Sequence, residues 1–218
     1  MRKSRVPLGL ASTVDLVNSS LTSNCAPNAW KHGLVTPLPK SSNLSDVSSF
    51  RPITVVPGIS KLVERIVHQQ LSDYFDEHML WSSTQHGYRR SHSTETALTV
   101  LSDFILSAMD NSEIVLVVLC DLSKGFDVVN HSLLLEKLRL YNVDTRWFES
   151  YLSEHTQQVQ YRGADGQLIR SESLPITMGV FQGTALGPIL FSVFCNDLAL
   201  HVPGVTIVQY ADDVQIAV

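Results

Sequence analysis

Hydrophobic residues recur three and four positions apart in several parts of the chain, which is the spacing of a helix with one buried face. The first such stretch begins after Pro57-Gly58 and continues to Phe75, with apolar side chains on a single stripe. We therefore predict an amphipathic helix there. Further helices are expected near residues 94–109, 131–140, 144–153 and 185–200.

Strand-like segments fall between these helices. A continuous β-branched run at 114–120 has the pattern of a central strand that is covered on both faces. Residues 206–210 and 214–218 flank Ala211-Asp212-Asp213, which predicts a hairpin with carboxylates at its turn. Short strands are also expected at 33–37 and 51–56 around a polar loop at 41–49, and in a polar hairpin near 156–177.

Together these elements predict an α+β fold, with few long strands and with helices on one side. Residues 1–27 lack clear periodicity and are expected to form a poorly ordered lead-in. The chain has 218 residues, of which 44% are hydrophobic, so it can form one large domain or two small lobes. This composition excludes a disordered, collagen-like or disulfide-scaffold protein.

The charge is distributed unevenly along the chain. The net charge is −5, but residues 1–100 carry 10 Lys and Arg against 7 Asp and Glu, while the remainder carries 6 against 14. A basic first part and an acidic second part are consistent with phosphate binding in one region and cation binding in another. An uneven surface charge without function is the alternative interpretation.

Several classes of protein are not indicated. Cys25, Cys120 and Cys195 are few, odd in number and far apart, so neither a disulfide framework nor a zinc site is expected. No apolar run approaches the ~20 residues of a membrane helix, and no signal peptide is recognised. We therefore expect an intracellular protein, nuclear or cytoplasmic, that is neither secreted nor in contact with a membrane.

Carboxylates follow the most hydrophobic strands. Asp121 comes directly after the run at 114–120, and Asp212 and Asp213 lie at a turn between two apolar strands. If these strands pair, three carboxylates meet at one sheet edge and need protons or divalent cations, because two like charges ~4 Å apart repel by roughly 4 kcal/mol at an effective dielectric near 20. Oxygen ligands favour Mg²⁺ or Mn²⁺, and two such ions catalyse displacement at phosphorus. Ordinary turn chemistry explains Asp-Asp equally well when it is considered alone.

Two further motifs change this balance. Asp121 is followed five residues later by an aromatic side chain, Phe126. Residues 177–188 form a glycine-punctuated loop that leads into an apolar helix, and its glycines allow the backbone to lie close to a ligand. The order of carboxylate and aromatic, Gln-Gly loop and Tyr-Ala-Asp-Asp is poorly explained by chance.

With these motifs in this order, the sequence resembles the reverse transcriptases of non-LTR (LINE-type) retrotransposons over about residues 28–218. The combination is highly specific, although no single block is. The matching blocks are Trp30 to Lys40, Phe50 to Ile53 with Lys61 and Glu64, Gln85 to Arg89 with Ser93-Thr94, Asp121 to His131, Trp147 to Leu152, Gly179 to Leu190, Asn196 to Leu198, and Tyr210 to Asp213.

The resemblance implies an RNA-directed DNA polymerase with an antiparallel palm sheet backed by helices. Such an enzyme extends a DNA primer with dNTPs on an RNA template and uses two Mg²⁺ (or Mn²⁺) ions. Its fingers would comprise about residues 28–90 and 129–178, and a partial palm about 91–128 and 179–218. The chain stops five residues after Asp213, so a fragment without thumb or endonuclease domain is expected.

The resemblance also assigns roles to individual residues. Asp121, Asp212 and Asp213 match the catalytic, metal-binding aspartates, and the backbone carbonyl of Leu122 would complete a metal shell. Phe126 matches the aromatic side chain that excludes a ribose 2′-hydroxyl. The remaining assignments are nucleotide binding by Lys40, Arg51, Gln182 and Gly183, and template-phosphate binding by Arg89 and Arg90.

Four positions depart from the family pattern. Phe181 replaces the usual proline before Gln-Gly, and this change is expected to shift the loop because proline fixes φ and phenylalanine does not. Thr184 replaces serine, Gly125 replaces alanine, and His155 replaces a common arginine.

Three other functions remain open at this stage. A catalytically inactive nucleic-acid-binding remnant would keep the fold without turnover. An RNA-dependent RNA polymerase shares the palm chemistry, but Phe126 argues against it. A metal-dependent phosphohydrolase would leave the fingers motifs unexplained.

Overall fold

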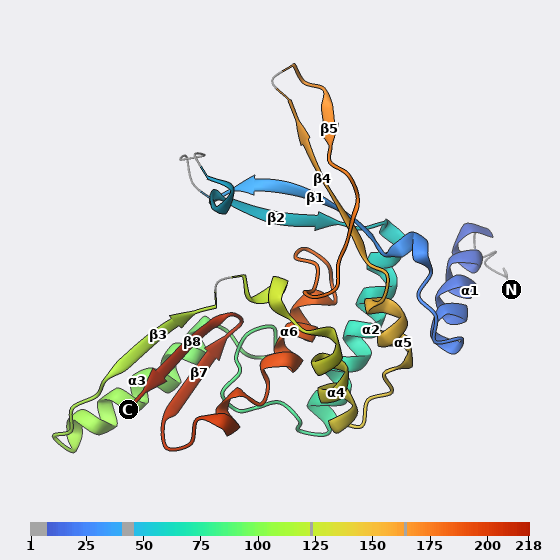
Figure 1. The fold of residues 1–218 in the computed structure, drawn as a ribbon. Helices are drawn as coiled ribbons and strands as arrows, with labels where there is room; N and C mark the ends of the chain where they lie inside the picture. The colour runs from blue at the N-terminus through green and yellow to red at the C-terminus, as the bar shows by residue number, and fades with distance from the viewer. Residues whose placement is uncertain (1–7, 41–45, 123, 164) are drawn as a thin grey trace, which may run out of the picture. The chain divides into compact units, whose positions relative to one another are not determined.

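The computed structural model describes residues 8–40, 46–122, 124–163 and 165–218 (Figure 1). The chain divides into two compact units. One contains Met1–Ile66, Leu138–Thr177 and Phe181–Ala185; the other contains Val67–Lys137, Met178–Val180 and Leu186–Val218.

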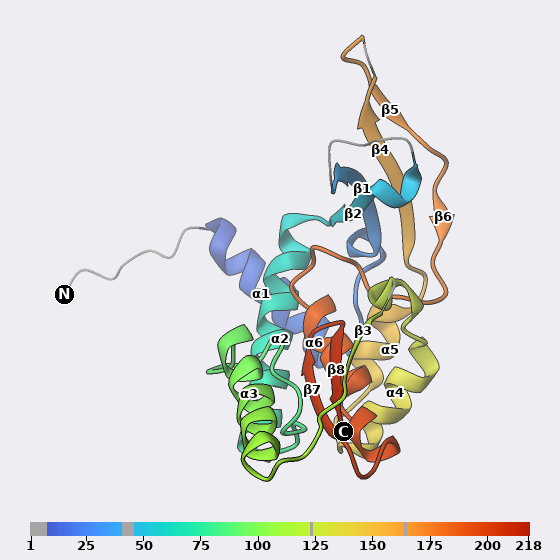
Figure 2. The same ribbon diagram turned by 90° about the vertical axis from the view of Figure 1, so that its left-hand side faces the viewer.

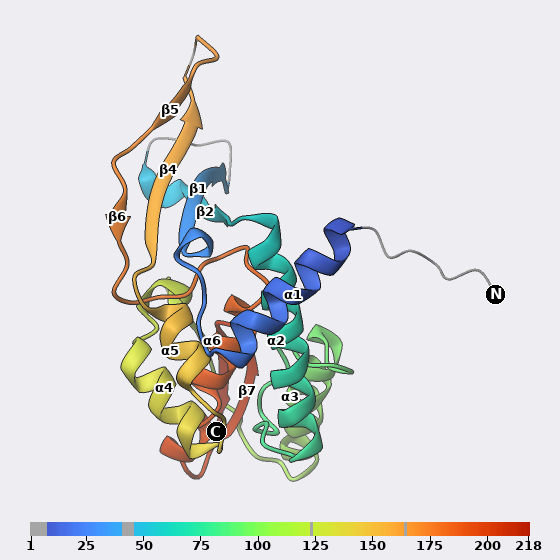
Figure 3. The ribbon, with the colours of Figure 1, turned by 90° about the vertical axis from the view of Figure 1, so that its right-hand side faces the viewer.

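The first unit is built on a mixed sheet with the strand order β2-β1-β4-β5, with β6 also paired to β4. β1 and β2 are antiparallel, whereas β1 and β4 are parallel. Beyond its pairing with β1, β4 continues into a long hairpin with β5 (Figure 3). The strands are β1 (His32–Pro39), β2 (Phe50–Val55), β4 (Thr156–Arg162), β5 (Leu168–Arg170) and β6 (Leu174–Pro175).

One helix of the first unit carries several of its buried aromatic residues. α5 (Arg146–Leu152) buries Trp147, Phe148 and Tyr151. Its Trp147 indole donates a hydrogen bond to Ser20 of α1 (Leu8–Thr22), at 3.2 Å. Short 3₁₀ turns, η1 (Asn28–Trp30) and η2 (Val47–Ser49), precede β1 and β2.

The second unit contains an antiparallel sheet with the order β3-β8-β7. α3 packs against β7, on one face of this sheet (Figure 2). Ser93 starts α3 with a capping box, because its hydroxyl accepts from the backbone N–H of Thr96 while the Thr96 hydroxyl bonds back to the Ser93 N–H. The elements are α3 (Thr94–Asp110), β3 (Val117–Asp121), η3 (Gly125–Val128), α6 (Gly187–Cys195), η4 (Leu198–His201), β7 (Thr206–Tyr210) and β8 (Asp213–Ala217).

Most sequence-predicted elements are confirmed. α2 (Gly58–Glu77) and α4 (His131–Leu140) occupy the predicted stretches, and each runs from one unit into the other along the chain. The predicted hairpins at 156–177 and 206–218 are both formed. No helix in the described part of the chain is long and apolar enough to cross a bilayer.

The prediction of a central strand covered on both faces is wrong. β3 lies at the edge of its sheet, and Leu119 in it is 73% exposed. A β-branched run shows a preference for extended backbone but cannot show how many neighbours the strand has. The strand that carries Asp121 is therefore paired on one side by β8.

Two further differences have local causes. The helix expected over 185–200 ends at Cys195, because the side chain of Asn196 is bonded to the backbone of Leu80 and Ser82 instead of continuing an apolar stripe. Within the expected lead-in, Leu8–Thr22 form α1. The serines and threonines of that segment interrupt the spacing of apolar residues that indicates a helix.

Candidate active site

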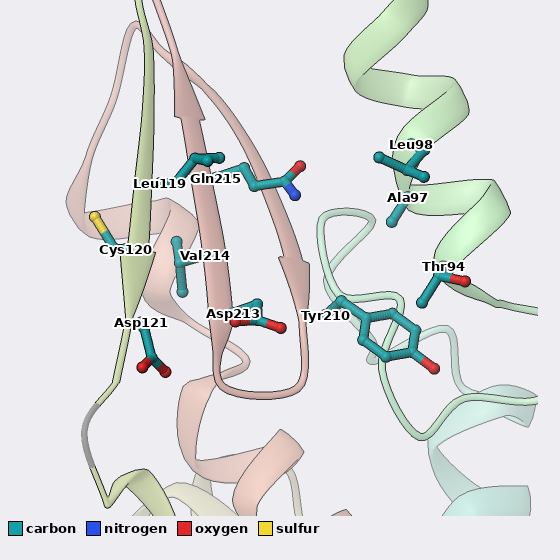
Figure 4. A pocket seen from close by; sticks show the side chains of 10 residues that line it. All are labelled: Thr94, Ala97, Leu98, Leu119, Cys120, Asp121, Tyr210, Asp213, Val214 and Gln215. Carbon is teal, nitrogen blue, oxygen red and sulfur yellow. The ribbon is translucent and has the colours of Figure 1, made fainter. Parts of the chain in front are cut away.

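Two of the predicted carboxylates lie opposite each other on neighbouring strands. Asp121 ends β3, Asp213 begins β8, and the antiparallel register pairs these two residues directly. Residues that face each other in this way project from the same face of the sheet. Figure 4 shows both carboxylates at the same end of the two strands. Both residues are exposed, so solvent and small ions reach them.

The turn between β7 and β8 places Asp212 next to this pair. Tyr210 is paired with Asp213, so Ala211 and Asp212 form a two-residue hairpin turn. Ala211 has φ 58°, a left-handed conformation that costs a non-glycine residue roughly 1–2 kcal/mol. The backbone N–H of Leu122 donates to the carbonyl of Asp212 at 3.3 Å, which joins the end of β3 to the turn.

The convergence of all three carboxylates on metal ions stays a prediction. Within the described residues, no three His, Cys, Asp or Glu side chains are grouped so that they could hold a metal ion. The reason is the alternation of strand side chains, because Asp213 shares a face with Asp121 while Asp212 belongs to the turn. What the backbone brings together is a pair of carboxylates.

A groove adjoins the two carboxylates. It has a volume of about 400 Å³ and lies between the start of α3 and the β3–β8 strands (Figure 4). Thr94, Leu98 and Tyr210 line it together with both aspartates, so its walls are largely apolar while one end is acidic.

The segment around Gln85 is hydrogen-bonded to β7, next to the turn that carries Asp212 and Asp213. The N–H of His86 donates to the carbonyl of Gln209, and the N–H of Gln209 donates to the carbonyl of Thr84, each at 2.8 Å. The Gln85 and Gln209 side chains are fully buried, and the Gln85 carboxamide accepts from the N–H of Gly87 at 2.7 Å. A Cβ atom at Gly87 would come within 2.2 Å of the Ala211 nitrogen, so the two backbones are in direct contact.

Phe126 lies in η3 and is half-buried. Its ring stacks on Phe191 of α6, with centroids 4.7 Å apart, and the Tyr88 ring lies nearly perpendicular to it, with centroids 6.3 Å apart. Gly125 fits this arrangement where the family usually has alanine, because a Cβ there would come within 3.1 Å of the Phe191 ring. Burial, together with the nearby charge of Asp212, raises the pKa of Tyr88, so its hydroxyl stays protonated.

The two predicted fingers cations share one face of the β1–β2 hairpin. Arg51 is paired with Leu38, and the N–H of Lys40 donates to Ser49 at 2.8 Å, just beyond the end of β1. Because side chains alternate along a strand, Lys40 and Arg51 lie on the same side. Both are exposed, and neither forms an ion pair with any described residue.

The Gln-Gly loop is held against β2. The carbonyl of Gln182 accepts from the N–H of Thr54 at 2.7 Å. Gly183 has φ 97°, and a Cβ there would come within 3.1 Å of both Ile53 and Thr54. Position 183 therefore requires glycine for two reasons: the backbone has a positive φ, and there is no room for a Cβ atom.

The two arginines predicted to bind the template differ in their surroundings. Arg89 Nη1 donates to the carbonyls of Ser82 and Gln85, and the guanidinium lies 5.8 Å from the ring centroid of Trp81. Arg90 is exposed, and its Nη2 forms an ion pair with Oδ1 of Asp73 at 3.5 Å. Arg89 thus holds its own loop together, and Arg90 is the more accessible of the two; template binding stays a prediction for both.

Sequence reasoning assigned no role to three buried polar residues near these motifs: Glu64, Gln85 and Gln209. Glu64 had a detectable signal, because it falls on the apolar face of α2 beside Val63 and Val67, where a carboxylate is unusual. The two glutamines gave no local signal. They are 124 residues apart, and their meeting depends on the fold.

Comparison with known proteins gives consistent matches. A profile of the family described as "Reverse transcriptase (RNA-dependent DNA polymerase)" matches residues 38–218. The RNA-directed DNA polymerase from mobile element jockey of Drosophila melanogaster is 34% identical over 212 residues, covering 91% of this chain and 22% of that protein. The probable RNA-directed DNA polymerase from transposon BS of the same organism is 32% identical over 215 residues, with the same coverage of 91% and 22%. The chain thus spans about a fifth of the length of these relatives.

Solved structures agree on the fold. Telomerase from Candida albicans, in complex with a TWJ fragment of telomeric RNA, aligns with a TM-score of 0.57 and 15% identity, over 93% of this chain and 42% of that one. Apo telomerase from Candida tropicalis, truncated from its C-terminal domain, aligns with a TM-score of 0.55 and 13% identity, over 88% of this chain and 44% of that one. The predicted polymerase-like α+β fold is confirmed.

Proposed function

The chain belongs to the reverse transcriptase (RNA-dependent DNA polymerase) family, and we propose that it is the part of a LINE-type non-LTR retrotransposon polymerase that carries the catalytic aspartates. The proposed reaction transfers a deoxynucleotide from a dNTP to the 3′-hydroxyl of a primer. The observation that supports it best is the direct pairing of Asp121 with Asp213 at the exposed end of two strands.

The donor set at this position suits magnesium. Mg²⁺ prefers oxygen ligands and is usually held by one or two carboxylates together with substrate phosphates, instead of by a closed protein cage. The exposed, directly paired carboxylates of Asp121 and Asp213 suit an open site of this kind. We propose that Asp121 and Asp213 hold two Mg²⁺ (or Mn²⁺) ions with the Asp212 carboxylate and the Leu122 carbonyl. When bound, these ions lower the pKa of the primer hydroxyl and neutralise the triphosphate.

The other predicted residues would position the nucleotide. Phe126 is half-buried and its ring stacks on Phe191, and we propose that this ring excludes a ribose 2′-hydroxyl. Lys40 and Arg51 present two cations on one face of the β1–β2 hairpin, without an ion pair to any described residue, which suits a triphosphate. Because Gly183 has no side chain, the backbone of the loop that contains Gln182 and Gly183 can approach a bound nucleotide closely.

We also propose that the template is RNA and that the primer is DNA. Arg90 is the more accessible candidate for a template phosphate, with Arg89 beside it. A polymerase with these substrates would act inside the cell, in the nucleus or the cytoplasm.

A primer-extension assay on an RNA template with Mg²⁺ and dNTPs tests the proposal. We expect incorporation by the wild-type protein and a loss of at least about 100-fold in Asp121→Asn and Asp213→Asn, since charge stabilisation by bound metal contributes several kcal/mol. Asp110→Asn is the matched control, because this exposed carboxylate ends α3 and has no proposed role.

Other outcomes identify the rival functions. If wild type and both variants bind RNA equally but extend no primer, the protein is a nucleic-acid-binding remnant. Incorporation of ribonucleotides at a rate comparable to that of deoxynucleotides would identify an RNA polymerase. Hydrolysis of nucleotides without a primer would identify a phosphohydrolase.

A further inference from the structure

A carboxylate is buried in the first unit, whereas the three aspartates belong to the second. Glu64 of α2 is 1% exposed. Its Oε1 accepts hydrogen bonds from the Ser60 hydroxyl at 3.2 Å and from the Tyr151 hydroxyl at 3.1 Å. Its Oε2 accepts from the backbone N–H of Ala185 at 2.8 Å. Burying a carboxylate is costly unless donors replace the lost water, and here those donors come from α2, α5 and a loop.

That loop is the Gln-Gly loop, which comprises residues 182–185. The carbonyl of Gln182 is fixed to Thr54 of β2, and the N–H of Ala185 is fixed to Glu64 of α2. Between these two anchors lie Gly183 and Thr184, and the Thr184 hydroxyl donates back to the carbonyl of Phe181 at 2.9 Å. The loop is therefore held at both ends, with Gly183 exposed between the anchors.

Tyr151 fixes the orientation of the carboxylate. It stacks on Trp147, with centroids 5.1 Å apart and planes 12° from parallel, so its ring has little freedom. Burial and the neighbouring charge of Glu64 raise the pKa of Tyr151 well above its ordinary value. Its hydroxyl therefore remains a donor to Glu64 throughout the pH range of any assay. With one oxygen held by Tyr151 and Ser60, the other is aimed at the Ala185 N–H.

We infer that Glu64 is a positioning residue, which sets the Gln182–Ala185 loop in the conformation that receives the incoming nucleotide, and that Tyr151 orients it. The inference rests on the proposed nucleotide-binding role of this loop. It adds a residue that does not touch substrate and that acts through the Ala185 N–H. Loss of this hydrogen bond should therefore weaken nucleotide binding more than it slows the chemical step.

Glu64→Gln tests this inference in primer extension. The amide can present an NH₂ group where Ala185 needs an acceptor, so we expect KM for dNTP to rise about 10-fold, the effect of losing one charge-assisted hydrogen bond. We expect kcat at saturating dNTP to change less than about 3-fold, because the aspartates are untouched. Glu77→Gln makes the same chemical change at the exposed end of α2 and should leave both constants unaltered.

Tyr151→Phe provides a second variant that keeps the aromatic core. It removes one donor from Oε1 but leaves the Ala185 bond, so we expect a KM increase of about 2- to 3-fold, smaller than that in Glu64→Gln. If Glu64→Gln does not fold, this variant decides the question. An equal fall in kcat and kcat/KM, or an unchanged KM in a folded variant, would overturn the inference.

Amide hydrogen exchange separates this inference from the proposed function. We expect faster exchange across Gln182–Ala185 in Glu64→Gln than in wild type, and no change in Glu77→Gln. If wild type extends no primer, the proposed function fails, while the exchange result still decides whether Glu64 holds the loop. Unchanged exchange in the loop would overturn the inference even in an active enzyme.

Discussion

The imidazole of His155 stacks on the ring of Phe181, with centroids 4.7 Å apart and planes 14° from parallel. Both residues depart from the family pattern, which usually has arginine and proline at these positions. The Phe181 ring also occupies space that Gly33 leaves open, since a Cβ on Gly33 would come within 2.9 Å of it. Stacking and packing thus constrain the start of the Gln-Gly loop where the family uses the fixed φ of proline.

We predict that Phe181→Ala lowers the free energy of unfolding by about 3–5 kcal/mol, because a large buried ring is replaced by a cavity. In a double-mutant cycle with His155→Ala, the coupling energy should be about 0.5–1.5 kcal/mol. Urea denaturation of the wild type, both single variants and the double variant measures it. Strictly additive effects would show that the two departures are independent.

The contact between Gly87 and the Ala211 turn gives a second prediction. Gly87→Ala would place a Cβ within 2.2 Å of the Ala211 nitrogen, so backbone must move. We expect a loss of about 1–3 kcal/mol of stability, the usual cost of overpacking, together with reduced primer extension as the Asp212-Asp213 turn shifts.

Gly58→Ala is the matched control for this substitution. A Cβ at Gly58 has no neighbour within 4 Å, and the residue begins α2. We expect unchanged or slightly higher stability, by up to about 1 kcal/mol, because alanine restricts the unfolded chain. Similar losses in both variants would contradict the proposed role of the Gly87 contact.

The direct opposition of Asp121 and Asp213 predicts a conflict between stability and function. Like charges that face each other across a strand pair destabilise a sheet, so Asp213→Asn should stabilise the metal-free protein by about 0.2–1 kcal/mol while abolishing extension. Thermal unfolding in EDTA measures the gain in stability of Asp213→Asn over wild type. This gain should become smaller when Mg²⁺ is added. A variant that is less stable than wild type in EDTA would argue against repulsion between the two.

His86 predicts a pH dependence. Burial, followed by the charges of His92 and Arg89, lowers the pKa of His86 below 6.5, its ordinary value. Protonation therefore favours the unfolded chain: the stability is fully present above about pH 6.5 and falls as the pH drops through the folded-state value, by at most about 1.4 kcal/mol per pH unit for one proton.

Urea denaturation of wild type and His86→Gln, at about pH 7.5 and about pH 5.5, isolates this contribution. The pKa of His68 is also lowered by burial, so the comparison between the two proteins, instead of the wild-type curve alone, carries the test. We expect a smaller loss of stability on acidification in His86→Gln. Equal losses of stability in the two proteins would show that a group other than His86 causes the pH dependence.

The parts of the structure that were predictable from the sequence are those with local causes. The apolar stripe of α2 and the alternation around Ala211 are readable within a dozen residues, and both elements form as predicted. The exposure of β3 was not predictable, because it depends on the number of strands beside it. Which of Asp212 and Asp213 lies opposite Asp121 could be learned only from the register of β8 against β3.

Supporting residues were harder to predict than the residues they support. Gln85 and Gln209 are ordinary polar residues in the sequence, and their meeting depends on the bridge between their segments. Glu64 lies on the apolar face of α2, but its target, the Ala185 N–H, lies 121 residues away in the sequence. Motif similarity locates the candidate chemistry, whereas the residues that hold it in place become visible only in the folded chain.

The outer edge of β3 has a practical consequence for work with this protein. Within the described part of the chain β3 is bonded to β8 alone, so its other side presents unsatisfied amides and carbonyls beside the exposed Leu119. Such an edge captures extended peptide from other molecules, and capture increases with concentration. Because Asp121 ends this strand, self-association on storage would cover the candidate active site, while the helices would still give an intact circular dichroism spectrum.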